Sequence, residues 1–171
     1  ALLRKEERTR PMLDRTPALR AMLRAPTLLE TRALLGGEWV DGEGGKTFAV
    51  RNPARGDVIA EVADLSRAQV AQAIEAARVA QKAWAARSAK ARAHVMRKWF
   101  DLMMANQEDL AVILTAEMGK PLAEARGEIA YGASFVEFFG EEAKRIYGET
   151  IPGHQPDKRI TVLRQPIGVA P

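Results

Sequence analysis

PLAEARGEIAYGASFVEFFGEEAKRIYG, residues 121–148, governs the architecture of this chain, because its apolar residues recur at helical spacing over many turns. Pro121 suits the first turn of a helix and Gly148 suits the position after its end, so we expect a helix that runs to Tyr147. This helix is expected to face a core. The positions spaced for burial are Ile129, Val136, Phe139, Ala143 and Ile146.

Small side chains gather along the middle of the same helix. They are Gly127, Ala130, Gly132, Ala133 and Ser134. Glycine inside a helix costs about 1 kcal/mol relative to alanine, so their use suggests a packing or access role. We expect another helix or strand to approach closely here, and a neutral accident is the alternative.

Three further helices are expected before this one. Ser66 and Gln69 form a capping box at the start of the first, and Ser88 can start the second. Asn106 is expected to cap the third, and Gly119 to close it in a left-handed conformation. Their apolar faces are expected to be core. These faces carry Val70, Ala73, Ile74, Ala77 and Trp84, then Val95, Met96, Trp99, Leu102 and Met103, and finally Leu110, Ile113 and Leu114.

Short β-favouring runs separated by turn residues fill residues 34–65, which predicts small antiparallel hairpins. The glycines at 36–37 and 42–45 fit neither a GxGxxG nor a Walker pattern that opens a helix, so we interpret them as turn glycines. Two more strand-like runs, residues 159–164 and 166–169, follow the long helix. Pro166 cannot donate to a sheet ladder, so we expect a break between them.

The composition excludes several classes of function. Hydrophobic residues make up 47% of the 171 residues and charged residues 28%, as in ordinary globular proteins, and no apolar run approaches the ~20 residues that span a bilayer. There is no cysteine, which excludes disulfides and thiolate metal sites within the chain. His94 and His154 stand far apart. We therefore expect no membrane partner and no metal site.

The positive charge is confined to one segment. Residues 1–32 hold eight Lys and Arg against four Asp and Glu, whereas residues 33–171 hold eighteen of each. A nucleic-acid-binding domain would carry its basic patch on the folded body, so no nucleic-acid partner is expected. Pro11, Pro17 and Pro26 interrupt any long helix. We expect residues 1–32 to be a disordered or artefactual basic tail, with a transit peptide or translated sequence upstream of the true start as alternatives.

From spacing alone, no acid–base pair, activated nucleophile or phosphate cradle can be assembled, so the residues by themselves predict a soluble α/β fragment. The order of segments, however, resembles the N-terminal part of the aldehyde dehydrogenase superfamily across residues 34–171. The stretches EARGEI and EEAKRIYGETIPG look most like the NAD(P)-dependent succinate-semialdehyde dehydrogenase branch. The pieces that carry the resemblance are GGEWVDG (36–42), RNPARGDVIAEV (51–62), AWAARSAKAR (83–92), LTAEMGKPLAEARGEIAYGASFVEFFGEEAKRIYGETIPG (114–153) and RQPIGVAP (164–171).

The resemblance implies an incomplete α/β fold, the N-terminal portion of an aldehyde dehydrogenase-like domain. Its parts would be β-hairpins, four helices, and then the first strands of the oligomerisation region and of the dinucleotide-binding sheet. Residues 33–171 would form this truncated domain, after the tail of residues 1–32.

The same resemblance implies oxidation of an aldehyde through a cysteine thiohemiacetal, with hydride transfer to NADP or NAD. In the family, the residues that do this chemistry follow the strand that matches residues 166–169. No catalytic or cofactor-binding residue is therefore assigned in this chain. We expect the fragment alone to be inactive and to bind no cofactor.

In similar enzymes, the helix matching residues 122–147 borders the tunnel through which the aldehyde enters. Tyr131 and Phe135 are therefore candidate residues of the substrate tunnel, and packing in the core is the alternative reading. Arg126 could attract the carboxylate of a semialdehyde, because a guanidinium forks onto two oxygens. We favour a surface or interdomain salt bridge for Arg126.

For the complete protein, the resemblance implies a small-molecule aldehyde substrate, most of all succinate semialdehyde oxidised to succinate. It also implies a cytoplasmic homo-oligomer, either a dimer or a tetramer. The competing hypothesis is a non-catalytic oligomerisation or binding module derived from the same fold. Such a module would associate with full-length partners through an exposed strand edge.

Overall fold

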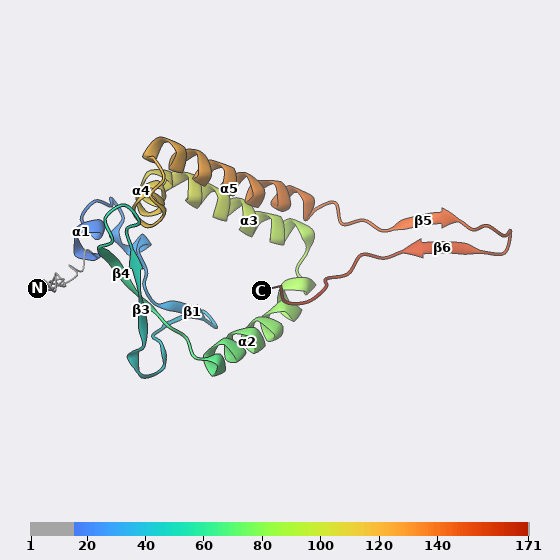
Figure 1. Ribbon diagram of the computed structural model, residues 1–171. Coiled ribbons are helices and arrows are strands. Elements are labelled where there is room, and N and C mark those ends of the chain that lie inside the picture. The colour runs from blue at the N-terminus through green and yellow to red at the C-terminus, as the bar shows by residue number, and fades with distance from the viewer. Residues whose placement is uncertain (1–15, 171) are drawn as a thin grey trace, which may run out of the picture.

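The computed structural model describes residues 16–170 and shows an open arrangement of hairpins and helices (Figure 1). The hairpins β1–β2 and β3–β4 lie at one end with α1, α5 lies along α3, and the hairpin β5–β6 projects away from the helices. The elements are α1 (Thr16–Arg20), η1 (Pro26–Leu28), β1 (Ala33–Leu35), β2 (Glu38–Val40), η2 (Glu43–Gly45), β3 (Thr47–Arg51), β4 (Val58–Ala63), α2 (Arg67–Ala86), α3 (Ala89–Ala105), α4 (Gln107–Met118), α5 (Leu122–Glu142), β5 (Glu149–Pro152) and β6 (Arg159–Val162).

All three strand pairs in the described residues are antiparallel hairpins, which confirms the prediction for residues 34–65. In the first, Leu34 pairs with Trp39. The turn between them places Gly36 at φ 61° and Gly37 at φ 98°, in the left-handed region that side chains avoid. Both residues are therefore turn glycines, as the sequence indicates.

The helix starts agree with the sequence in two places and differ in a third. Ser66 and Gln69 form the predicted capping box, and the Ser88 hydroxyl accepts a hydrogen bond from the Ala91 amide at 3.2 Å. Asn106 stands between α3 and α4, but its side chain donates backwards to the Leu102 carbonyl and leaves the start of α4 without a side-chain cap. Asn106 is thus the N-cap residue of α4, as predicted, but its side chain bonds α3 instead of capping α4.

The long helix is shorter than predicted. It ends at Glu142, and the amides of Lys144 and Arg145 bond three residues back, which tightens the chain into turns. Gly148 does not stop a helix. A Cβ on Gly148 would overlap the carbonyl oxygen of Val162, so glycine is needed where β5 meets β6. The sequence pattern missed β5 entirely.

Residues 166–169 were predicted as a strand and form none in the described chain. A strand is held by hydrogen bonds to a neighbouring strand, and the described residues offer none at this place. The first predicted strand is present as β6 but ends at Val162, so no break between two strands is formed near Pro166.

Much of the predicted core is exposed. No residue of α2, all of which is described, is buried, and Val70, Ile74 and Trp84 are each more than a third exposed. Phe139 and Ile146 are likewise exposed. The chain has 13238 Å² of accessible surface, whereas a compact monomer of its mass of 18.8 kDa would have about 8,300 Å². Apolar spacing thus identified faces of helices that no other part of this structure covers.

The covered face of α5 packs on α3 and α4. Its buried residues are Ala125, Ala133 and Gly140, so the close approach predicted for the small-residue patch holds at Ala133. It does not hold at Gly127 and Gly132, because a Cβ built on either would have no described atom within 4 Å apart from its chain neighbours and the backbone of its own helix. Those two glycines lie on the open side of the helix.

Part of the segment predicted to be a tail is folded. Leu19, Leu23 and Leu29 are buried in one apolar cluster, with residues of α4 packed against it. The expectation that the tail is disordered is therefore wrong for residues 16–32, because this segment is folded and three of its leucines pack against an apolar helix face. The remainder of that prediction, residues 1–15, lies outside the described residues.

Candidate functional site

The candidate tunnel residues lie together on α5. Tyr131 and Phe135 are four residues apart and thus neighbours on one helix face. Their rings meet edge to face, with centroids 4.9 Å apart and an interplanar angle of 77°. Tyr131 is 63% exposed and Phe135 46% exposed, so neither is a core residue of this chain. The structure brings the two candidates together as an exposed aromatic pair.

A second aromatic pair continues the apolar surface toward the end of the helix. Phe138 and Phe139 also meet edge to face, with centroids 5.3 Å apart, and both are more than half exposed. Phe135, Phe138 and Phe139 line a shallow groove, together with the polar residues Ser134, Glu137, Glu141, Glu142 and Arg145. Such a surface can hold an apolar or methylene chain. The hydroxyl of Ser134 donates to the Tyr131 carbonyl at 2.7 Å, inside its own helix.

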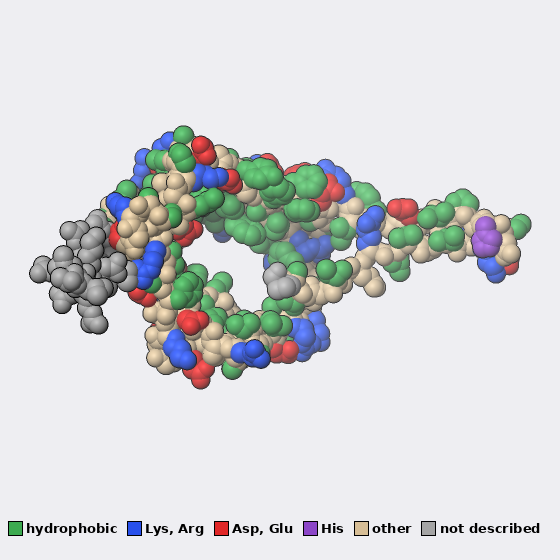
Figure 2. All heavy atoms as spheres, in the orientation of Figure 1, with side chains coloured by type: hydrophobic (Ala, Val, Ile, Leu, Met, Phe, Trp, Pro, Cys, Tyr) green, Lys and Arg blue, Asp and Glu red, His purple; other side chains and the backbone are tan. Residues whose placement is uncertain are grey.

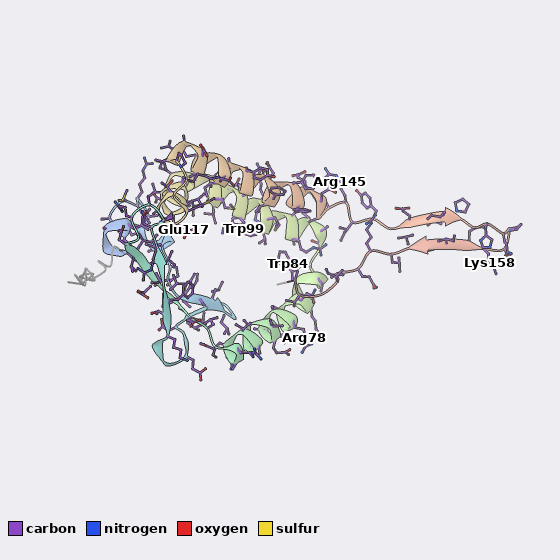
Figure 3. All side chains as sticks on the ribbon, viewed as in Figure 1. Arg78, Trp84, Trp99, Glu117, Arg145 and Lys158 are labelled. Carbon is purple, nitrogen blue, oxygen red and sulfur yellow. The ribbon has the colours of Figure 1, made fainter. Side chains whose placement is uncertain are left out.

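Apolar side chains are gathered along the border of the opening between α2 and the α3–α5 pair (Figure 2). Among them are two tryptophans, Trp84 on α2 and Trp99 on α3, which Figure 3 labels. Trp84 is 37% exposed and Trp99 is 54% exposed. Large aromatic side chains contribute much of the energy of contact surfaces when they are covered. The described residues thus form several exposed apolar surfaces and no enclosed cavity.

Arg126 is held at the start of α5 by a carboxylate of α4. Its Nε and Nη2 atoms donate to the two oxygens of Glu108, at 2.7 and 2.8 Å. The hydrogen bond from Arg126 lowers the pKa of Glu108, and the bond to Glu108 raises the pKa of Arg126. The favoured salt-bridge interpretation of Arg126 is confirmed. Its fork is already occupied by a carboxylate of this chain.

The described residues contain no glycine-rich loop that opens a helix and no cluster of metal-ligating side chains. Gly36 and Gly37 lie in the turn of the β1–β2 hairpin, Gly44 and Gly45 lie in η2, and neither pair opens an α-helix. The Ser66 and Ser88 hydroxyls accept hydrogen bonds from the amides of Gln69 and Ala91, so one amide at the start of α2 and one at the start of α3 are already bonded. Within residues 16–170, no three His, Asp or Glu side chains converge to hold a metal ion. No helix in that range is long and apolar enough to cross a bilayer.

Sequence reasoning missed one important side chain, Asp109. It is 4% exposed, and its two carboxylate oxygens accept hydrogen bonds from the backbone amides of Arg24 at 3.1 Å and Ala25 at 2.7 Å. An aspartate in the first turn of a helix is common, so the local sequence gave no signal. Its partners lie more than eighty residues earlier in the chain.

Comparison with known proteins places these elements in a wider context. The sequence profile of the aldehyde dehydrogenase family matches residues 39–171. The chain is 58% identical over 147 residues to the glutarate-semialdehyde dehydrogenase of Pseudomonas aeruginosa, a match that covers 86% of this chain and 30% of that protein. It is 54% identical over 142 residues to the NADP(+) succinate-semialdehyde dehydrogenase of Escherichia coli, covering 83% and 30%.

The fold is similar as well. The crystal structure of succinate-semialdehyde dehydrogenase from Burkholderia pseudomallei superposes with a TM-score of 0.82 at 50% identity, over 86% of this chain and 30% of that one. The chain therefore spans about 30% of the length of the relatives it matches.

Proposed function

The chain belongs to the aldehyde dehydrogenase family, and from that premise we propose that it is the N-terminal part of an NAD(P)-dependent semialdehyde dehydrogenase. The observation that carries the proposal is the identity of 58% and 54% to two semialdehyde dehydrogenases over most of this chain. The whole protein would act on a small-molecule aldehyde and use NADP or NAD.

The proposed substrate is succinate semialdehyde, oxidised to succinate. The name of one relative points to succinate semialdehyde and that of another to glutarate semialdehyde, which is one methylene longer. Both molecules carry a carboxylate opposite the aldehyde, joined by a short methylene chain. An apolar pocket discriminates one methylene by only about 10–200-fold, so we expect measurable activity with both.

Tyr131 and Phe135 are proposed to form part of the tunnel wall. Their exposed aromatic faces suit the methylene chain of such a substrate, and an apolar wall would exclude water from the path of the aldehyde. The carboxylate of the substrate would find its partner elsewhere in the whole protein, because Arg126 is bound to Glu108.

This chain is proposed to contribute part of the tunnel wall and no group that takes part in the oxidation. The family reaction needs a thiolate nucleophile, and the sequence has no cysteine. Oxidation of the bound aldehyde would therefore depend on residues outside these 171. We propose that the isolated chain is inactive and binds no nicotinamide cofactor.

The whole protein is proposed to be a cytoplasmic homo-oligomer, either a dimer or a tetramer. Support comes from the hairpin β5–β6, in which every residue of both strands is exposed (Figure 1). Size-exclusion chromatography with light scattering would measure the number of subunits. A monomeric whole protein would refute this part of the proposal.

The test begins with the coding DNA beyond codon 171, which should encode a single nucleophilic cysteine in the same frame. The whole protein should then reduce NADP or NAD with succinate semialdehyde, and more slowly with glutarate semialdehyde and with an uncharged aldehyde of equal length. A stop codon directly after Pro171, with no aldehyde oxidation by the purified chain, would favour the non-catalytic module instead.

A further inference from the structure

The first turn of α4 contacts two distant parts of the chain through three consecutive residues. Gln107 donates to the Arg126 carbonyl at 2.9 Å, and Glu108 binds the Arg126 guanidinium. Asp109 faces the other way and accepts from the amides of Arg24 and Ala25. This turn therefore joins α5 on one side to the N-terminal segment on the other.

The carboxylate of Asp109 is unusual because it is buried while its recorded partners are backbone amides. Burying an ionised carboxylate is costly unless it receives hydrogen bonds. Bonds from N–H groups to a charged oxygen are shorter and stronger than neutral ones. The 2.7 and 3.1 Å contacts supply one bond to each oxygen. The segment around residues 24–25 thus satisfies a group that would otherwise have to remain in water.

The helix face beyond Asp109 is apolar and already filled. Val112, Ile113 and Ala116 follow Asp109 at intervals of three, four and seven residues, so all four lie along one face of α4. The three helix residues pack against the buried cluster of Leu19, Leu23 and Leu29. One helix face therefore offers a carboxylate and an apolar strip to the same short segment.

A further anchor lies at the end of this segment. The Ala63 amide, at the end of β4, donates to the Thr31 carbonyl at 2.8 Å. The segment is thus bound near its middle by Asp109, along its length by the leucine cluster, and at its end by the β3–β4 hairpin. Three separate contacts therefore hold this segment in place.

We propose that residues 18–32 form a strap that docks on α4, and that Asp109 is the residue that recognises it. The α4 surface fits an occupant of defined chemistry: a short leucine-bearing segment with two successive free backbone amides. The occupant here is the chain's own residues 18–32. The proposal is independent of the aldehyde chemistry and of any part of the protein outside these residues.

The test is limited proteolysis of the full 171-residue chain with trypsin, followed by mass spectrometry. The bond between Arg24 and Ala25 can be cut only when the Ala25 amide leaves Asp109. Asp109→Asn keeps the size of the side chain but replaces one acceptor oxygen with an NH₂ donor that faces a backbone N–H. We expect cleavage after Arg24 to accelerate about tenfold relative to cleavage after Arg78 in α2.

The control is Glu117→Gln, which removes the same charge from an exposed position of α4 (Figure 3). It should leave the ratio of the two cleavage rates unchanged. Leu23→Ala removes the apolar side of the same contact and should also raise cleavage after Arg24 selectively. This second variant keeps the proposal testable if Asp109→Asn does not fold.

Three results would overturn the proposal. One is an unchanged ratio in both Asp109→Asn and Leu23→Ala. Another is an equal acceleration at every site, because that would report general destabilisation of the chain. The third is the same selective acceleration in the Glu117→Gln control.

Discussion

The contact between α5 and α3 can be tested by adding a single methyl group at two glycines of the same helix. Gly140 is buried, and a Cβ built on it would lie 3.0 Å from the Cβ of Met96 and 3.9 Å from the Ala93 carbonyl oxygen, both on α3. Gly132 has no described atom within 4 Å of that position. Gly140→Ala and Gly132→Ala therefore differ in whether the new methyl group meets α3.

The expected energies follow from two opposing effects. Alanine is favoured over glycine in a helix interior by about 1 kcal/mol, which should stabilise both variants equally. Overpacking a close contact costs about 1–3 kcal/mol, and this cost applies only to Gly140→Ala. With a cost of about 2 kcal/mol, Gly132→Ala gains about 1 kcal/mol and Gly140→Ala loses about 1 kcal/mol.

Thermal unfolding of the 171-residue chain, followed by far-ultraviolet circular dichroism, measures the difference. For a chain of this size, 1 kcal/mol shifts the midpoint by about 2–4 °C, so the two variants should lie about 6 °C apart. Gly127→Ala is a second control and should behave as Gly132→Ala does. If Gly140→Ala raises the midpoint as much as the controls do, α3 and α5 do not approach each other as described.

Three further predictions concern a helix cap, an ion pair and the tunnel wall. Ser88→Ala should destabilise the chain by about 1 kcal/mol and Ser88→Gly by only a few tenths, in the same unfolding assay. The hydrogen bond from Arg32 lowers the pKa of Glu30 from 4.5 to about 2. The Glu30–Arg32 ion pair therefore makes its full contribution to the free energy of unfolding above about pH 4.5, and this contribution is lost as the pH falls through about 2. An NMR titration should show this midpoint for Glu30 and a partial rise of its pKa toward 4.5 in Arg32→Gln, since the backbone amides of residues 31 and 32 still donate to the carboxylate. In the whole protein, Phe135→Ala and Tyr131→Ala should raise KM for the semialdehyde several-fold more than they lower kcat, and unchanged steady-state constants would refute a wall role.

Local hydrogen bonding explains which sequence predictions hold. The capping box of Ser66 and Gln69 joins residues three apart, and the left-handed Gly119 at φ 79° closes α4 by donating a hydrogen bond from its amide to the Thr115 carbonyl. Each feature depends on a few neighbouring residues, so a short pattern predicts it. The hairpin glycines hold for the same reason. Asn106 stands at the predicted N-cap position, but its side chain bonds the preceding helix, because two helices compete for it.

Burial could not be predicted in the same way. Spacing indicates that Phe139 and Ile146 belong to apolar faces, yet both are exposed, because the described chain places nothing over them. Small residues such as Gly127 and Gly132 are typical of a surface where helices pack closely. The close contact with α3, however, lies at Gly140. An apolar pattern shows that a helix face can be buried by another part of the protein. It does not identify what covers it.

The sequence by itself determined the helices α2 to α5, the hairpins β1–β2 and β3–β4, most of the helix caps and the family resemblance, because these depend on residues close together in the chain. Only the tertiary structure decided which faces meet. It brought Asp109 to the amides of Arg24 and Ala25, and it turned the expected tail at residues 18–32 into a docked segment. The physical reason is distance along the chain: contacts across more than eighty residues leave no periodic mark in either partner.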